Sequence, residues 1–158
     1  MLSRNPTHRA FSLIELMLVI AIISVFGAIA IPRYANSLQQ YRAHLAAKRV
    51  ATDLKMAQFR ARALSTSRTV TFTVTGSSYQ IAGETDLIRS GTTYTVQLLD
   101  LPYRATITSA QFGAAAGTSS ISFNGFGMPN NGGSITVVSG NFTKTVTVAP
   151  LTGAISIQ

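Results

Sequence analysis

Residues 11–31, FSLIELMLVIAIISVFGAIAI, are apolar apart from Ser12, Glu15 and Ser24. A helix of about 20 apolar residues is long enough to cross the hydrocarbon core of a bilayer. A carboxylate inside such a segment is costly unless an opposite charge pairs with it. The segment therefore predicts a membrane-embedded helix in which Glu15 has a specific role.

The ten residues before this segment, MLSRNPTHRA, are polar and basic, as at the start of a secretory signal peptide. The apolar run is nevertheless longer than the apolar region of a signal peptide. A small-x-small cleavage pattern occurs only inside the run, at residues 28–30. We therefore interpret residues 11–31 as a segment that the mature chain keeps.

The chain after this segment divides into two parts. Residues 32–67 have the apolar spacing of a helix, and residues 68–158 contain Thr-, Val- and Ile-rich runs between turn residues. The expected strands are TVTFTV, SYQIA, TYTVQLL, ATITSA, SISF, SITVVS, TVTVA and AISI. The sequence predicts an α+β fold: one long N-terminal helix, membrane-embedded in its first half, packed in its second half against an antiparallel β-sheet domain.

The helix predicted over residues 32–67 carries two apolar stripes on roughly opposite faces. One stripe is Tyr34, Leu38, Tyr41 and Leu45, and the other is Ala43, Ala47, Val50, Leu54, Ala57, Ala61 and Leu64. The second stripe has mostly small residues, which suit close packing under a sheet. The first stripe indicates either contact with a neighbouring subunit or an ordinary surface helix.

Composition limits the chemistry that the chain can perform. Only 11% of its 158 residues are charged, against about a quarter in soluble domains, which agrees with a membrane segment. The sequence has no Cys and two His, which excludes disulfides and argues against a zinc site. The strand region has neither a nucleophile–base pair nor a phosphate-binding loop, so we predict no catalytic residue, no metal and no cofactor.

The net charge of +8 is concentrated in residues 33–68, where Asp53 is the single acid. Residues 69–158 are balanced in charge. The candidate contacts for phosphate groups are Lys55, Arg60, Arg62 and Arg68. These cations are suited to DNA, or to anionic lipid headgroups and acidic neighbouring subunits. The neutral strand region favours the second interpretation over DNA.

The motif AFSLIEL at residues 10–16, followed by MLVIAIISVFGAIAIP, resembles the class III signal of type IV pilins and pseudopilins. The resemblance implies that a prepilin peptidase cuts between Ala10 and Phe11, and that Phe11 is then N-methylated. The family usually has Gly before the cut, where this chain has the almost equally small Ala10. Glu15 becomes the fifth mature residue, and its carboxylate is expected to pair with the Phe11 amine and set the register between subunits.

Two further segments, at residues 54–74 and 121–157, resemble GspH- and FimT-type minor pseudopilins. The first is LKMAQFRARALSTSRTVTFTV, and the second includes a turn from Phe123 to Gly127 and a Thr-Gly turn at residues 152–153. The resemblance implies a structural subunit of a type II secretion system or type IV pilus, assembled near the filament tip. The alternatives are a FimT-like subunit that binds DNA for transformation and a signal-anchored periplasmic enzyme.

The same resemblance implies four parts: a cleaved leader (1–10), a transmembrane helix (11–31), a periplasmic helix (32–67) and a β-rich domain (68–158). The protein is then single-pass in the bacterial inner membrane, with its C-terminal domain in the periplasm. The local count of Lys and Arg around the apolar segment does not itself favour this orientation. The implied partners are other pilin or pseudopilin subunits, the prepilin peptidase/N-methyltransferase and inner membrane lipid.

Overall fold

The computed structural model describes residues 11–86, 91–113 and 119–158. The expected leader, with Ala10 at its end, lies outside the described residues. The chain divides into two compact units, Met1–Asn36 and Ser37–Gln158. One helix, α1 (Leu13–Ala63), begins in the first unit and ends in the second.

The helix ends at Ala63 and not at Ser67, where the apolar spacing placed its end. Ser65 adopts a left-handed conformation with φ 50°. The backbone amide of Thr66 donates to the carbonyl of Ala61 (3.2 Å), and that of Ser65 donates to the carbonyl of Arg62 (3.2 Å). These bonds satisfy carbonyls that have no partner at a helix end, so the chain turns there into the first strand.

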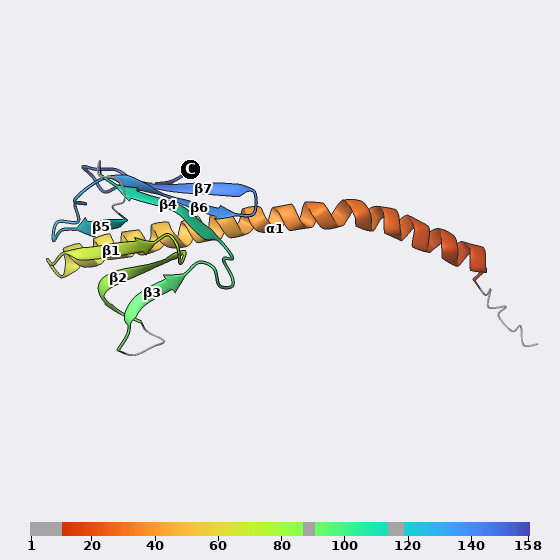
Figure 1. The fold of residues 1–158 in the computed structure, drawn as a ribbon, viewed down its shortest axis with the longest axis horizontal. Helices are drawn as coiled ribbons and strands as arrows, with labels where there is room; N and C mark the ends of the chain where they lie inside the picture. Colours follow the sequence, from red (N-terminus) through yellow and green to blue (C-terminus); the bar gives the residue numbers. More distant parts are fainter. Residues whose placement is uncertain (1–10, 87–90, 114–118) are drawn as a thin grey trace, which may run out of the picture. The chain divides into compact units, whose positions relative to one another are not determined.

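The described residues of the unit Ser37–Gln158 include eight strands, which form two antiparallel four-stranded sheets (Figure 1). One sheet has the order β3-β2-β1-β5, from β1 (Arg68–Thr73), β2 (Ser78–Thr85), β3 (Thr93–Gln97) and β5 (Ser120–Phe123). The other has the order β4-β6-β7-β8, from β4 (Thr106–Phe112), β6 (Gly133–Ser139), β7 (Phe142–Val148) and β8 (Ile155–Ile157). The predicted α+β class is confirmed, and each predicted run forms a strand. The division into two sheets was not predicted.

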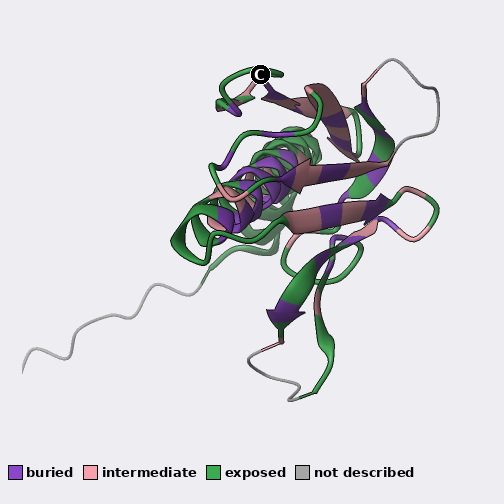
Figure 2. Ribbon diagram, turned by 90° about the vertical axis from the view of Figure 1, so that its left-hand side faces the viewer, coloured by how far each residue is buried: buried purple, intermediate pink, exposed green. Residues whose placement is uncertain are grey.

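The core of this unit lies between α1 and the two sheets. Figure 2 shows the buried residues along one face of the helix and at alternate positions of the strands. The helix contributes mainly small buried side chains: Ala43, Ala46, Ala47, Val50, Ala51, Leu54, Ala57 and Ala61. Across from them, the ring of Phe72 lies 5.4 Å from Tyr79 and 5.7 Å from Phe112, measured between ring centroids. Small helix residues thus let the helix approach large strand residues closely.

The two predicted stripes of the helix differ in burial as expected. The second stripe is buried except for Leu64, which follows the end of α1 and is 56% exposed. In the first stripe, Tyr41 is exposed, and Leu38 and Leu45 are half-buried. The first stripe therefore faces away from the core.

The described residues of the unit Met1–Asn36 include the apolar first part of α1. Its large apolar side chains, such as Leu18 (62% exposed), Ile23 (63%) and Phe26 (69%), have no cover from the described chain. Pro32 lies inside α1 and does not end it. By length and composition, α1 is the one helix among the described residues that qualifies as a membrane span.

Candidate functional site

The N-terminal candidate site consists of Phe11 and Glu15, at the start of α1. Phe11 is exposed and precedes the helix, and Glu15 is exposed in its first turn. The first intrahelical bond runs from the Leu16 amide to the Ser12 carbonyl (3.1 Å). A carboxylate in the first turn interacts favourably with the unpaired amides of a helix N-terminus. Helix geometry thus gives Glu15 a favourable position even before a cationic partner is considered.

Two of the four candidate phosphate-binding cations converge on one buried carboxylate. Glu84 of β2 is 7% exposed, and its Oε2 accepts a hydrogen bond from Arg60. The Nε of Arg68 lies 3.5 Å from Glu84 Oε1. The helix end and the strands β1 and β2 are therefore connected by charge pairing. In this arrangement the charges of Arg60 and Arg68 are partly balanced by Glu84 within the fold.

Arg62 holds a turn, whereas Lys55 projects from the helix surface. The Nε of Arg62 donates to the carbonyl of Phe126 (3.1 Å), in the turn between β5 and β6. Lys55 is exposed. Arg60 and Arg68 thus share one carboxylate, whereas Arg62 contacts a turn and Lys55 is exposed.

Gln58 connects the two turns that first suggested a minor pseudopilin. Its Nε2 donates to the carbonyls of Gly127 (2.9 Å) and Gly153 (3.3 Å). Both glycines have positive φ, 74° and 66°, a conformation that residues with a Cβ rarely adopt. The two turns are therefore anchored side by side on α1 by a single amide.

A buried cluster around Asp53 was not predicted. Asp53 is 4% exposed, and its Oδ2 accepts hydrogen bonds from the hydroxyls of Tyr79 (2.6 Å) and Tyr94 (3.1 Å). The Nε of Arg49, one turn earlier on α1, also donates to Oδ2 (3.0 Å). Arg49 donates a second bond to the Tyr94 hydroxyl. One carboxylate therefore joins the helix to β2 and β3.

This cluster shifts the proton affinities of its members. Burial, followed by the negative charge of Asp53, raises the pKa of Tyr79 well above its usual value of 10. The same two causes raise the pKa of Tyr94. Burial lowers the pKa of Arg49, but the combined attraction of Asp53 and of the nearby tyrosine hydroxyls outweighs that effect, and the net pKa is raised. Both tyrosines are therefore neutral hydrogen-bond donors at ordinary pH, and Arg49 is charged.

The sequence did contain a signal for this cluster. Asp53 follows Val50 by three residues and precedes Ala57 by four, so it lies on the stripe predicted to be buried. Arg49 precedes Asp53 by four residues, the spacing of an ion pair on a helix. The two tyrosine partners come from strands more than 20 residues away, and their approach could not be read from the helix alone.

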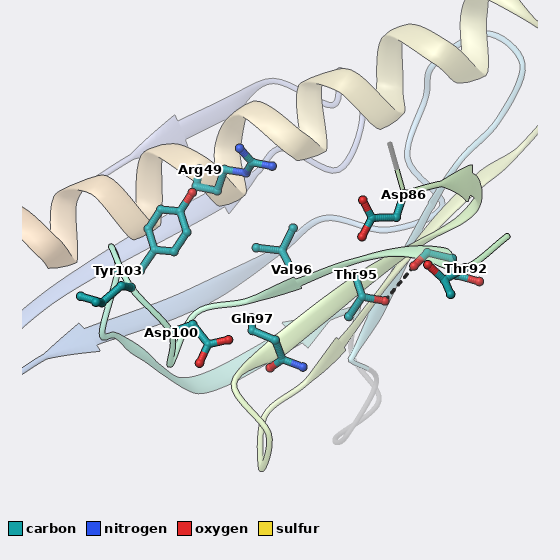
Figure 3. A pocket seen from close by; sticks show the side chains of 10 residues that line it. Arg49, Asp86, Thr92, Thr95, Val96, Gln97, Asp100 and Tyr103 are labelled. Carbon is teal, nitrogen blue, oxygen red and sulfur yellow. Dashed lines mark hydrogen bonds between the residues drawn. The ribbon is translucent and has the colours of Figure 1, made fainter. Parts of the chain in front are cut away.

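A cavity of about 550 Å³ lies beside the cluster, on the outer side of β3. Figure 3 shows Arg49 and Tyr103 at one side of it and side chains of β3 along its length. Asp86 and Asp100 also line it, near the start and beyond the end of β3. Among residues 11–86, 91–113 and 119–158, no three or more His, Cys, Asp or Glu residues form a group that would hold a metal ion.

The sequence matches the family model for the prokaryotic N-terminal methylation motif over residues 5–31. A long apolar helix with this motif and an attached β-rich unit defines a pilin-like protein. The sequence also matches the model for type II transport protein GspH over residues 46–152, more than half of its length. The chain therefore belongs to the type II transport protein GspH family.

Structural similarity agrees with this assignment. The fold is similar to that of the minor pseudopilin EpsH from the type 2 secretion system of Vibrio cholerae, with a TM-score of 0.54 and 11% identity. The similarity covers 74% of this chain and 96% of that one. No curated protein matches the sequence at a significant level. At this identity the structural match establishes the fold, and the family models carry the assignment.

These matches confirm the resemblance to minor pseudopilins. The GspH match also spans residues 76–118, which lie between the two segments, 54–74 and 121–157, that carry the resemblance. The family and fold are those of structural pseudopilins, and they favour a secretion subunit over a DNA-binding one. The roles of Ala10, Phe11 and Glu15 remain predictions.

Proposed function

We propose that this protein is a minor pseudopilin of a type II secretion system that acts as a structural subunit. The observation that carries the proposal is the methylation motif at the start of an apolar helix whose large side chains are exposed. Such a surface requires lipid or other apolar helices around it. The GspH match over residues 46–152 supports secretion as the system that it serves.

In this proposal the protein exists first as an inner membrane protein and then as a filament subunit. A prepilin peptidase removes residues 1–10, and Phe11 becomes the N-methylated first residue. Residues 11–31 then cross the inner membrane, and the helix from residue 32 and the β-rich domain from residue 68 lie in the periplasm. Other pilin or pseudopilin subunits receive this helix in the filament.

Hydrophobic burial contributes little to the transfer of the apolar helix from the membrane to the filament. Apolar side chains gain little hydrophobic free energy on leaving lipid for a helix bundle, because lipid tails are equally apolar. Close packing and polar pairing must therefore favour the filament. Glu15 is costly in lipid, and pairing with the Phe11 amine of its own or a neighbouring subunit removes that cost. The pair also fixes the axial register.

The first stripe of the helix gives a second contact with neighbouring subunits. Tyr41 is 61% exposed, and Leu38 and Leu45 are half-buried on the face turned away from the core. Aromatic residues are enriched at protein interfaces, where one end of the ring stays hydrated. We infer that this face packs against another filament subunit. The resemblance to GspH-type minor pseudopilins supports a position near the filament tip.

Cleavage and N-methylation at Phe11 provide the direct test of this proposal. Mass spectrometry of the protein from membranes of cells with prepilin peptidase should find a chain that starts at N-methylated Phe11. Ala10→Gly should be cut at least as well as the wild type, and Ala10→Trp should stay uncut because the subsite accepts only a small residue. A mature N-terminus anywhere other than Phe11 would refute the proposal.

A further inference from the structure

Three cations form a row along the outer side of α1. Lys48, Lys55 and Arg62 follow one another at intervals of seven residues, close to two helical turns, so they lie about 10 Å apart along one face. All three are exposed, and none forms an ion pair with a carboxylate of the described residues. The bond from Arg62 to the Phe126 carbonyl holds the last cation in place. The described chain therefore leaves this positive row unneutralised.

Exposed aromatic rings and a groove accompany the row. Tyr41 (61% exposed) precedes Lys48 by seven residues, and Phe59 (71%) follows Lys55 by four, so both rings lie on the same side of the helix. A groove of about 250 Å³ adjoins this face. It is lined by Leu45, Lys48, Arg49, Thr52 and Tyr103. Exposed apolar surface of this kind marks a site that another protein covers.

The positions of the acidic residues show that a second copy of this chain does not match the row. The sequence has five acidic residues. Asp53 and Glu84 are buried, and Glu15 lies in the apolar part of α1. Asp86 and Asp100 lie before and after β3, so they do not share a helix face. Carboxylates at seven-residue spacing must therefore come from a different protein.

Anionic lipid matches the row less well than a protein helix does. In the proposed function the headgroups meet α1 near residue 31, and Lys48 is the cation of the row nearest to that end. The row is about 21 Å long, whereas physiological salt screens charges over about 8 Å. Headgroups would therefore interact with one end of the row, whereas a helix alongside α1 reaches all three cations.

We propose that this face of α1 binds an acidic α-helix of another protein, whose carboxylates repeat at seven-residue intervals and pair with Lys48, Lys55 and Arg62. Apolar side chains of that helix pack on Tyr41, on Phe59 and in the groove. Exposed ion pairs add little affinity, so the apolar contacts hold the partner and the charges select it. The inference rests on the proposed function, because it gives the chemistry of the subunit that packs on this side of α1.

Fluorescence anisotropy with the full-length protein in micelles of an uncharged detergent tests the inference. The probe is the fluorescein-labelled peptide EAAQLAQEAAQLAQEAAQLAQ, here called the spaced peptide, which has Glu at every seventh position beside a row of Leu. The control peptide EAAQLAQQAAELAQQAAQLAE has the same composition, but its Glu residues lie on different faces. The spaced peptide should bind at least about fivefold more tightly, because only it can form three ion pairs at once. Equal binding of two equally helical peptides would show nonspecific attraction and would overturn the inference.

Substitutions test the row itself. Lys55→Gln should weaken binding of the spaced peptide about two- to fivefold, the range of an exposed ion pair. Gln111→Glu makes the same change in net charge at an exposed position of β4, between the buried Ala110 and Phe112, and should leave binding unchanged. Both variants should keep the thermal unfolding midpoint of the wild type, because both side chains are exposed. If Lys55→Gln has no effect, or if both variants weaken binding equally, the row is not the site.

Charge reversal and added lipid complete the test. Lys48→Glu/Lys55→Glu protein should prefer a peptide with Lys at each Glu position over the spaced peptide, and an unreversed preference would contradict ion pairing. Phosphatidylglycerol added to the micelles should leave the wild-type preference for the spaced peptide intact. Loss of that preference would assign the row to anionic headgroups and reject the inference. A mature chain that starts at Phe11 but shows no preference would reject only this inference and retain the proposed function.

Discussion

The two parts of helix α1 use apolar residues in opposite ways. In the unit Met1–Asn36 the side chains are large and exposed, as at Leu18 (62%) and Phe26 (69%). In the unit Ser37–Gln158 the apolar residues of the buried face are mostly Ala, and each is at most 4% exposed. Small residues allow a sheet to approach the helix closely, whereas large exposed residues require lipid or other helices. One helix thus serves the protein's own core in its second part, and its first part is proposed to contact lipid or other subunits.

The polar residues follow the same division. Asp53, in the second part, has three donors from its own chain, Arg49, Tyr79 and Tyr94. Glu15, in the first part, is exposed at the helix start. A carboxylate with partners inside its own domain stabilises the fold, whereas Glu15 is proposed to find its partner during assembly.

The largest effect on folding is expected at the buried part of the helix. Leu54 is 1% exposed, so Leu54→Ala should lower the free energy of unfolding by about 2–5 kcal/mol. Leu18→Ala, the same change at a 62% exposed position, should alter it by less than about 0.5 kcal/mol. Denaturant unfolding of both full-length variants in detergent measures the difference. Equal destabilisation would mean that the first part of α1 supports the fold of the β-rich unit.

A smaller loss is expected when the Asp53 cluster loses one donor. Tyr79→Phe should destabilise the protein by about 1–3 kcal/mol at pH 7, since the buried Asp53 carboxylate loses a hydrogen bond. Tyr94→Phe should cost less, because that hydroxyl is less buried and farther from Oδ2, at 3.1 Å. Chemical unfolding at pH 7 ranks the two variants, and a larger cost at Tyr94 would contradict the account.

The raised pKa of Tyr79 also predicts a loss of stability in alkali. Folded Tyr79 keeps its proton above pH 10, whereas the unfolded chain releases it near the usual tyrosine pKa of about 10. The folded state then binds more protons, so stability is complete below about pH 10 and falls as pH rises further. Tyr79→Phe should make this fall less steep, with Tyr94 supplying the remainder. If the free energy of unfolding of Tyr79→Phe falls as steeply as that of the wild type between about pH 9 and 11.5, the buried Tyr79 hydroxyl is not the cause of the alkaline loss of stability.

The smallest effect is expected for DNA binding. Arg60, Arg62 and Arg68 contact Glu84 or a backbone carbonyl, so the protein should bind duplex DNA weakly at physiological salt. Arg60→Ala and Arg62→Ala should change that binding little. Fluorescence anisotropy across a salt series measures it, with a log–log slope of about −0.9 expected per phosphate contact. Micromolar, steeply salt-dependent binding that these substitutions abolish would restore the DNA alternative.

Local patterns in the sequence predicted most of the fold. The apolar run, the alanine-rich stripe and the strand sequences each depend on neighbouring residues, and each was identified. The convergence of Arg60 and Arg68 on Glu84, the tyrosine donors to Asp53 and the division into two sheets depend on pairing between distant segments. A single sequence carries no pattern for such pairing. The sequence therefore predicts the helix and the strands, which depend on local periodicity. It does not predict the polar contacts, because these join segments that are distant in the chain.

We propose that Glu15 directs assembly and is not needed for folding of the β-rich unit, and Glu15→Val tests this proposal most directly. The measurement is the fraction of fully processed Glu15→Val protein recovered in sheared filaments, together with its partner subunits, relative to the wild type. We predict normal cleavage before Phe11, normal or improved membrane insertion, and loss of the variant from filaments, with Glu15→Asp intermediate. Normal recovery of processed Glu15→Val protein in filaments would contradict the account.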